Sequence, residues 1–205
     1  MKVVSMDMSP TYLPVTLEEI PDAQHKIAFD RFHVAQLINK ALDDVRRKES
    51  HELREILKES ALMGNRFLWL KNLEKLNREQ KSDLSALRGI SNKTGRAWLL
   101  KELARTLWDY TTRGWAERAW MKWYGRAIRS QLAPFKIVAK SIKRNLWGIV
   151  NAIGLNANNG SAESINSKIK MIKAKARGFR NSERFKTAIL FHCGGLSLLP
   201  ETHSM

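Results

Sequence analysis

Two short apolar segments near the start of the chain each stop abruptly at an aspartate. They cover residues 2–6 and 25–29, and Asp7 and Asp30 follow them. A helix-like stretch at 16–20 and a Pro21-Asp22 break lie between them. The order strand, helix, strand predicts a parallel crossover unit. Because sites in open α/β sheets form outside the carboxyl ends of the strands, we expect both aspartates at a functional edge.

The rest of the chain has the apolar spacing of helices. After residue 32 we expect helices at about 34–57, 69–87, 93–110, 115–132 and 135–153. A polar loop at 154–160 precedes a helix that ends near residue 176, and a last helix covers about 182–194. The sequence therefore predicts a small α/β element within a chain that is mostly α-helical by residue count.

The positive charge is concentrated in the second half of the chain. Residues 1–110 carry 19 basic and 16 acidic side chains, whereas residues 111–205 carry 17 basic and 4 acidic ones. Such a field attracts polyanions and favours salt-dependent binding of nucleic acid. Ribosomal proteins and membrane-surface helices share this property, so charge alone makes nucleic acid only the leading class of partner.

One acidic residue stands out in the basic half. Glu163 is the only carboxylate between Arg118 and Ser182, among fourteen lysines and arginines. A carboxylate kept there suggests a magnesium ligand that faces phosphate. Within the expected helix it shares a polar face with Asn166 and Lys170, away from the apolar stripe. The alternative is an ordinary acidic residue at a helix start, where the helix dipole favours it.

Two groups of basic residues are candidates for contacting DNA phosphates. The first recurs at helical spacing and the second follows Glu163, and their members are Arg118, Lys122, Arg126 and Arg129, then Lys168, Lys170, Lys173, Lys175, Arg177 and Arg180. A merely solvated face would have the same pattern. Tryptophans cluster in the same region, at positions 98, 108, 115, 120, 123 and 147. Any one of them could stack on an unpaired base, but filling the core is their more common use.

Composition indicates the cellular compartment. The lone Cys193 excludes an internal disulfide framework and fits a reducing cytoplasm. No run approaches the roughly 20 apolar residues of a membrane span, and no signal peptide is recognisable. We therefore expect a soluble cytoplasmic protein with no membrane partner.

Several segments together resemble one known family. Residues 159–175, 178–185 and 192–195 resemble the C-terminal signature of bacterial insertion-sequence transposases of the ISL family. Val4-Ser-Met-Asp-Met-Ser-Pro-Thr-Tyr12 is similar to the family's second-aspartate segment, and Phe29-Asp-Arg-Phe-His-Val34 to its Asp-x-x-His segment. The matches occur in the family's order and cover nearly the whole chain.

The resemblance implies a ribonuclease-H-like catalytic domain whose two aspartates and one glutamate bind two Mg²⁺ ions. Asp7 matches the second aspartate and Glu163 the glutamate, so both are expected catalytic metal ligands. Two metals about 4 Å apart activate the attacking oxygen and stabilise the leaving oxygen in phosphoryl transfer. Asp30, His33 and Asn166 are expected in supporting roles. A helix-capping aspartate and a packed histidine are equally good explanations of Asp30 and His33.

The same resemblance implies a division of the chain. Residues 1–45 would be a partial ribonuclease-H-like core, 46–154 a large helical insertion, and 155–205 the catalytic and closing helices. The implied partners are transposon ends and target DNA near the bacterial nucleoid, with a possible homo-oligomer.

One part of the family pattern is expected upstream of the given sequence, namely the first catalytic aspartate. The chain therefore resembles a C-terminal fragment, and we expect it to be inactive alone in DNA strand cleavage and transfer. The alternative function is a non-catalytic DNA-binding or assembly protein derived from a transposase.

Overall fold

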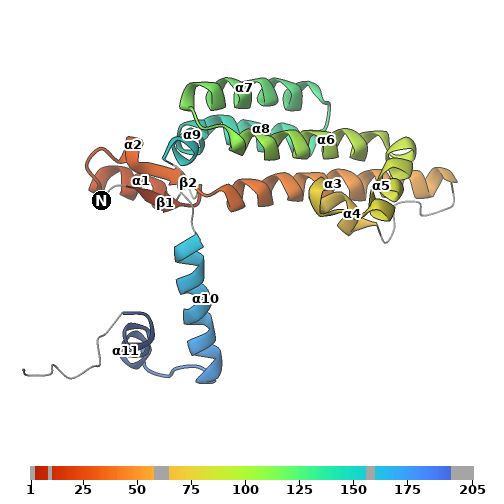
Figure 1. Ribbon diagram of the computed structural model, residues 1–205. Helices are drawn as coiled ribbons and strands as arrows, with labels where there is room; N and C mark the ends of the chain where they lie inside the picture. The colour runs from red at the N-terminus through yellow and green to blue at the C-terminus, as the bar shows by residue number, and fades with distance from the viewer. Residues whose placement is uncertain (1–2, 9–10, 58–64, 156–159, 195–205) are drawn as a thin grey trace, which may run out of the picture. The chain divides into compact units, whose positions relative to one another are not determined.

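The computed structural model describes residues 3–8, 11–57, 65–155 and 160–194, with the side chains of 56–57 and 160–166 outside the description. In the described residues the chain consists of helices and one small sheet of two strands, which lies at one end of helix α3 (Arg31–Leu57) (Figure 1). It divides into two compact units, residues 1–158 and residues 159–205. Each unit is described by itself. The expectation of a mostly helical chain with a small parallel sheet is confirmed.

The sheet consists of two short parallel strands. Strand β1 (Val4–Met6) pairs with β2 (Ile27–Phe29), and Met6 lies opposite Phe29. Helices α1 (Tyr12–Glu19) and α2 (Ala23–Lys26) form the crossover. The predicted parallel crossover is therefore confirmed. The expected strand at 25–29 is too long, because His25 and Lys26 complete α2 before the backbone becomes extended.

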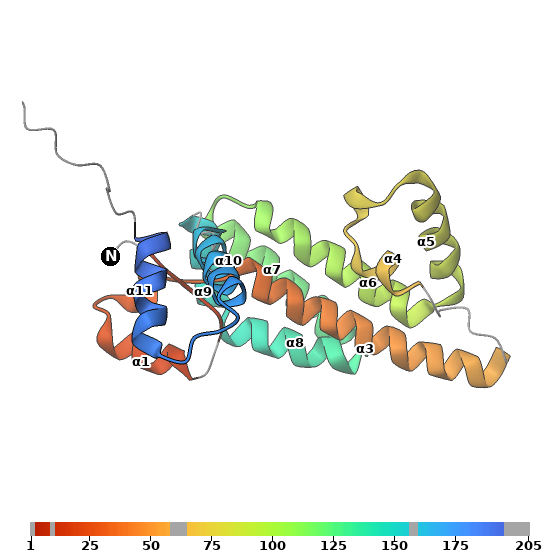
Figure 2. The same cartoon turned by 90° about the horizontal axis from the view of Figure 1, so that it is seen from below.

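Four helices of the first unit form a bundle. They are α3 (Arg31–Leu57), α6 (Asn92–Thr106), α7 (Arg113–Arg129) and α8 (Ala133–Arg144). Helix α3 contacts α6 and α8, and α7 contacts the same two helices, which closes the bundle (Figures 1 and 2). Its interior includes Leu42, Trp120 and Phe135, none more than 1% exposed. Burial of these large apolar side chains removes their surface from water, which stabilises the unit.

Helix α9 (Leu146–Gly154) joins the bundle to the sheet. It contacts β2 and α7. Gly148 lies directly against the ring of Phe29, where an added Cβ would overlap the ring. Asn151 Nδ2 donates hydrogen bonds to the carbonyls of Gln24 and Ile27, at 2.7 and 2.9 Å. The start of β2 is thus held by a helix more than a hundred residues away in sequence.

The expected helix at 69–87 is wrong. That region contains α4 (Arg66–Leu70), a 3₁₀ turn η1 (Leu73–Lys75) and α5 (Arg78–Ile90). The physical reason lies at Asn77, whose side chain accepts a hydrogen bond from the Gln80 N–H at 2.8 Å. Gln80 Oε1 accepts one from the Asn77 N–H in return. This capping box starts a new helix at residue 78.

The expected helix at 135–153 is also wrong, since it is divided between α8 and α9. The break lies at Asn145, whose Nδ2 donates to the Ser141 carbonyl at 3.0 Å. A side chain that bonds its own backbone in this way competes with the regular helical ladder. The expected end at residue 110 is late as well, because α6 gives way to a 3₁₀ turn, η2 (Leu107–Asp109).

The second unit is a pair of helices, α10 (Gly160–Lys175) and α11 (Ser182–Cys193). Asn181 caps α11 by accepting from the Glu183 N–H at 2.8 Å. Gly178, at φ 98°, makes the turn, and the rings of Phe179 and Phe185 pack 4.9 Å apart. Both expected helices are therefore confirmed. Among the described residues of the whole chain, no helix is long and apolar enough to cross a membrane.

A buried carboxylate joins α3 to α4. Asp43 pairs with Arg46 and Arg47 at 2.9 Å and with Arg66 at 3.3 Å. Burial by itself would raise the pKa of Asp43, but the Arg46 hydrogen bond and the three guanidinium charges outweigh it and lower the pKa below its ordinary value. The charged form of Asp43 is therefore the one that stabilises the fold.

Asp43→Asn is expected to lower the free energy of unfolding by about 2–3 kcal/mol, because Arg46 would be left nearly buried without a carboxylate. Urea denaturation at neutral pH measures the change. The neighbouring Asp44 is exposed, so Asp44→Asn is the matched control and should cost far less. A folded-state pKa below the unfolded value near 3.9 means that this stabilisation is lost as pH falls through the folded pKa. An equal loss in both variants, or a loss that persists in acid, would contradict this role.

Candidate catalytic edge and nucleic-acid interface

The carboxyl end of β1 presents an exposed carboxylate. Asp7 follows the strand directly, and its Oδ1 lies 3.9 Å from Nδ1 of the half-buried His33. His33 belongs to the first turn of α3, which begins just after β2 ends. The two strands are parallel and in register, so both chain segments emerge at the same edge of the sheet. Asp7 and Asp30 therefore lie at one edge of the sheet, as the strand pattern predicts, and His33 lies beside Asp7.

Asp30 lies at that edge with a clear structural role. Its N–H donates to the Met6 carbonyl at 3.1 Å, which extends the pairing of β1 with β2. Its Oδ1 accepts from the Phe32 N–H at 3.0 Å and its carbonyl from the Val34 N–H at 3.3 Å. These contacts are those of a residue that caps α3. Any supporting role in catalysis would be added to this one.

Glu163 and Asn166 lie on α10, but their side chains are outside the described part of the structure. Within residues whose side chains are described, no group of three His, Cys, Asp or Glu side chains could hold a metal ion. The proposed metal ligands remain a prediction from the sequence.

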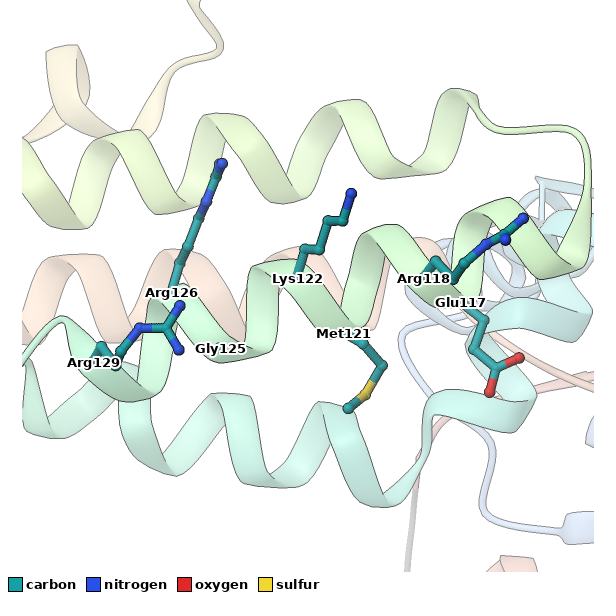
Figure 3. A pocket seen from close by; sticks show the side chains of 7 residues that line it. All are labelled: Glu117, Arg118, Met121, Lys122, Gly125, Arg126 and Arg129. Carbon is teal, nitrogen blue, oxygen red and sulfur yellow. The ribbon is translucent and has the colours of Figure 1, made fainter.

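The first group of predicted basic residues forms one face of α7. Arg118, Lys122, Arg126 and Arg129 are all exposed and line one open hollow of about 610 Å³. Figure 3 shows Lys122 and Arg126 on one side of the helix and Glu117 and Met121 on the other. From Arg118 to Arg129 the helix rises about 16 Å, the length of about five nucleotide steps along one DNA strand. We call these four cations the α7 basic face.

The second group lies on the other unit. Lys168, Lys170, Lys173 and Lys175 project from α10, and Arg177 and Arg180 follow in the turn before α11; all six are exposed. Lys168 and Lys175 also border a hollow of about 450 Å³ that is otherwise mainly apolar. Both predicted groups are therefore accessible to a polyanion.

Two further cations were missed in the sequence. Arg113 and Lys143 line a third hollow, of about 590 Å³, together with His25 and Trp147. This hollow shares Glu117 and Met121 with the hollow that the α7 basic face lines, so the two hollows are adjacent. The excess of basic residues after Thr111 was a general signal for both. It did not show which of them would share a surface with α7.

The tryptophans mostly serve the core, as their common use predicts. Trp69, Trp98, Trp120 and Trp123 are buried, and Trp123 Nε1 donates to the Leu100 carbonyl at 2.8 Å. Trp108 and Trp147 pack partly buried against the same core. Trp115 differs from these six because it is exposed.

An aspartate at the end of a parallel strand and two accessible sets of cations favour a protein that acts on nucleic acid. A family model described as "Transposase", for the ISL3 group, matches residues 1–189, and the chain belongs to this transposase family. The expected family is thereby confirmed.

Curated relatives agree with the family. The chain is 31% identical over 186 residues to the transposase for insertion sequence element IS1001 of Bordetella parapertussis, covering 90% of this chain and 45% of that protein. It is 28% identical over 224 residues to the transposase for insertion sequence element IS1557 of Mycobacterium tuberculosis, covering 98% and 50%. The chain thus spans about half the length of the curated relatives that it matches. No solved structure matches it.

Proposed function

We propose that this chain supplies part of the catalytic site and much of the DNA-binding surface of an insertion-sequence transposase. The observation that carries the proposal is the α7 basic face, four exposed cations on one helix of a transposase-family chain. Cations repeated along a rigid helix suit the regular phosphates of DNA. The proposed substrates are transposon ends and target DNA in the bacterial cytoplasm at the nucleoid, where the protein would assemble as a homo-oligomer.

Catalysis would depend on Mg²⁺ held by Asp7 and Glu163. The donor chemistry fits, because Mg²⁺ prefers carboxylate oxygens and Asp7 offers an exposed carboxylate at a strand end. When bound, the metal would supply Lewis-acid stabilisation of the charge that develops in phosphoryl transfer. His33, near Asp7, would orient that carboxylate or bind the DNA strand, and Asp30 would hold the start of α3. Asn166, one turn after Glu163, would support the ligand on α10.

The domain boundaries and the origin of the sheet belong to the same proposal. Strands β1 and β2 would be part of a ribonuclease-H-like core of residues 1–45, residues 46–154 an insertion, and residues 155–205 the closing helices. Helix α3 continues without a break past residue 45, so that boundary would lie within one rigid helix. The four-helix bundle would then hold α7 firmly in relation to the sheet edge.

The test of the DNA surface removes two charges from its middle. The double variant Lys122→Gln, Arg126→Gln should bind a duplex of arbitrary sequence about 10- to 100-fold more weakly at 50 mM salt, because two phosphate contacts and their counterion release are lost. Fluorescence anisotropy measures the affinity.

The matched control is Arg78→Gln, Lys81→Gln on α5. It removes the same two positive charges from exposed positions of a helix in residues 1–110, where acidic side chains nearly balance the basic ones. This control should change the affinity no more than about twofold. Equal weakening in the two variants would show that net charge, and not the α7 basic face, determines binding.

A further inference from the structure

Trp115 is exposed where the other six tryptophans are not. Its relative exposure is 59%, whereas Trp69, Trp98, Trp120 and Trp123 are each at most 4% exposed. Trp108 and Trp147 are partly buried against the core. Leaving the largest apolar side chain in water forgoes the burial that stabilises its counterparts. Core packing therefore explains six tryptophans and leaves Trp115 without a role.

The indole of Trp115 is held in place by its neighbour on the same helix. The Arg118 guanidinium carbon lies 4.2 Å from the ring centroid, a close cation–π contact. Arg118 Nε also donates to the Gly114 carbonyl at 3.2 Å, which fixes the guanidinium in turn. The arginine supports the indole and leaves more than half of the residue open to solvent. The result is a flat, supported aromatic surface.

The position of this surface points to its ligand. Arg118 belongs both to the Trp115 pair and to the α7 basic face, so the aromatic surface begins where the row of cations begins. A row of phosphate-binding cations that ends in an aromatic platform suits a nucleic-acid strand with an unstacked base at that point. Bases within an intact duplex already stack on each other and have no free face to offer. An unpaired base is therefore the part of a nucleic acid that this surface fits.

We propose that Trp115, supported by Arg118, stacks on an unpaired nucleobase of a DNA strand whose phosphates lie along the α7 basic face. This inference rests on the proposed DNA-binding function. It adds that the bound DNA is locally unpaired or distorted at the amino-terminal end of α7. Trp115 contributes little to binding a regular duplex.

The test compares three DNA molecules of one sequence: a perfect duplex, the duplex with one bulged adenine, and the duplex with a bulged abasic residue. The abasic bulge has the same flexibility without a base to stack. Wild-type protein should bind the adenine bulge about 5- to 100-fold more tightly than the abasic bulge, as expected for one stacked base. Trp115→Ala should abolish this preference, and Trp115→Phe should retain most of it.

Two controls make the outcome decisive. Ile137 on α8 is 71% exposed and apolar, so Ile137→Ala should leave every affinity unchanged. Replacing the bulged adenine by fluorescent 2-aminopurine should give quenching on binding to wild type and none with Trp115→Ala.

The inference is overturned if wild type shows no preference for the adenine bulge, or if Trp115→Ala keeps that preference. A change of oligomeric state in Trp115→Ala with unaltered DNA affinities would assign Trp115 to a protein contact instead. Loss of duplex binding itself would count against the proposed function, whereas loss of the bulge preference alone counts only against Trp115.

Discussion

Glu163→Gln is expected to abolish strand transfer while leaving DNA affinity equal or slightly improved. If Glu163 binds Mg²⁺, losing the carboxylate removes several kcal/mol of transition-state stabilisation, which corresponds to a rate loss of about a thousandfold or more. The affinity does not fall, because one negative charge facing phosphate disappears. Asp7→Asn should have the same effect. The measurement is strand transfer of end-containing DNA by a transposase of the relatives' full length that includes this chain.

Glu183→Gln is the matched control for that measurement. Glu183 is also an acidic residue in the first turn of a helix in a basic stretch, and it pairs with Lys186 at 2.8 Å. Its substitution should cost at most about 1 kcal/mol of stability and leave strand transfer intact. If Glu163→Gln behaved like Glu183→Gln, Glu163 would be only a charge at a helix start. The catalytic assignment would then be withdrawn, although membership of the transposase family would stand.

The fold could be predicted where the sequence marks the ends of its elements strongly. Asp7 and Asp30 interrupt short apolar runs, and this was enough to predict a parallel strand pair with both aspartates at one edge. The helix boundaries at Asn77 and Asn145 were missed, because side-chain hydrogen bonds to nearby backbone groups mark them. The apolar spacing continues through Asn145, whereas residues 77–83 carry no apolar side chain and were a usable signal for a break. Helical periodicity predicts which face of a helix is buried, but it predicts the position of a local break poorly.

The polar contacts between distant elements could not be predicted. Glu49 on α3 accepts hydrogen bonds from the Lys93 and Thr94 N–H groups, at 2.8 and 2.6 Å, and so caps the start of α6. The pair is more than forty residues apart, and nothing near Glu49 in the sequence indicates it. Asp43 is different, because Arg46 and Arg47 follow at helical spacing and were a usable signal.

The individual residues of the candidate site could be predicted from the sequence, whereas the surfaces that they form with their neighbours could be predicted only in part. The resemblance selected Asp7, His33 and Glu163, and the structure brings the first two within 3.9 Å. The helical spacing of Arg118, Lys122 and Arg126 predicted a common face, and they do line one hollow. Helical spacing could have separated Trp115 from the buried tryptophans of α7, because the stripe formed by Ala116, Trp120, Trp123 and Ala127 leaves Trp115 on another face. This signal was missed.

The central claim is that the excess positive charge of this chain forms a surface that binds DNA phosphates. The most direct measurement is the affinity for a duplex of arbitrary sequence at several salt concentrations between about 50 and 200 mM. Each neutralised phosphate contributes about 0.9 to the slope of log affinity against log salt. Four contacts from the α7 basic face predict a slope of about −3.6, and the six cations of the second unit could extend it to about −9. Lys122→Gln, Arg126→Gln should reduce the steepness by about 2. An affinity that stays flat across this range, or a slope that the double variant leaves unchanged, would contradict the account.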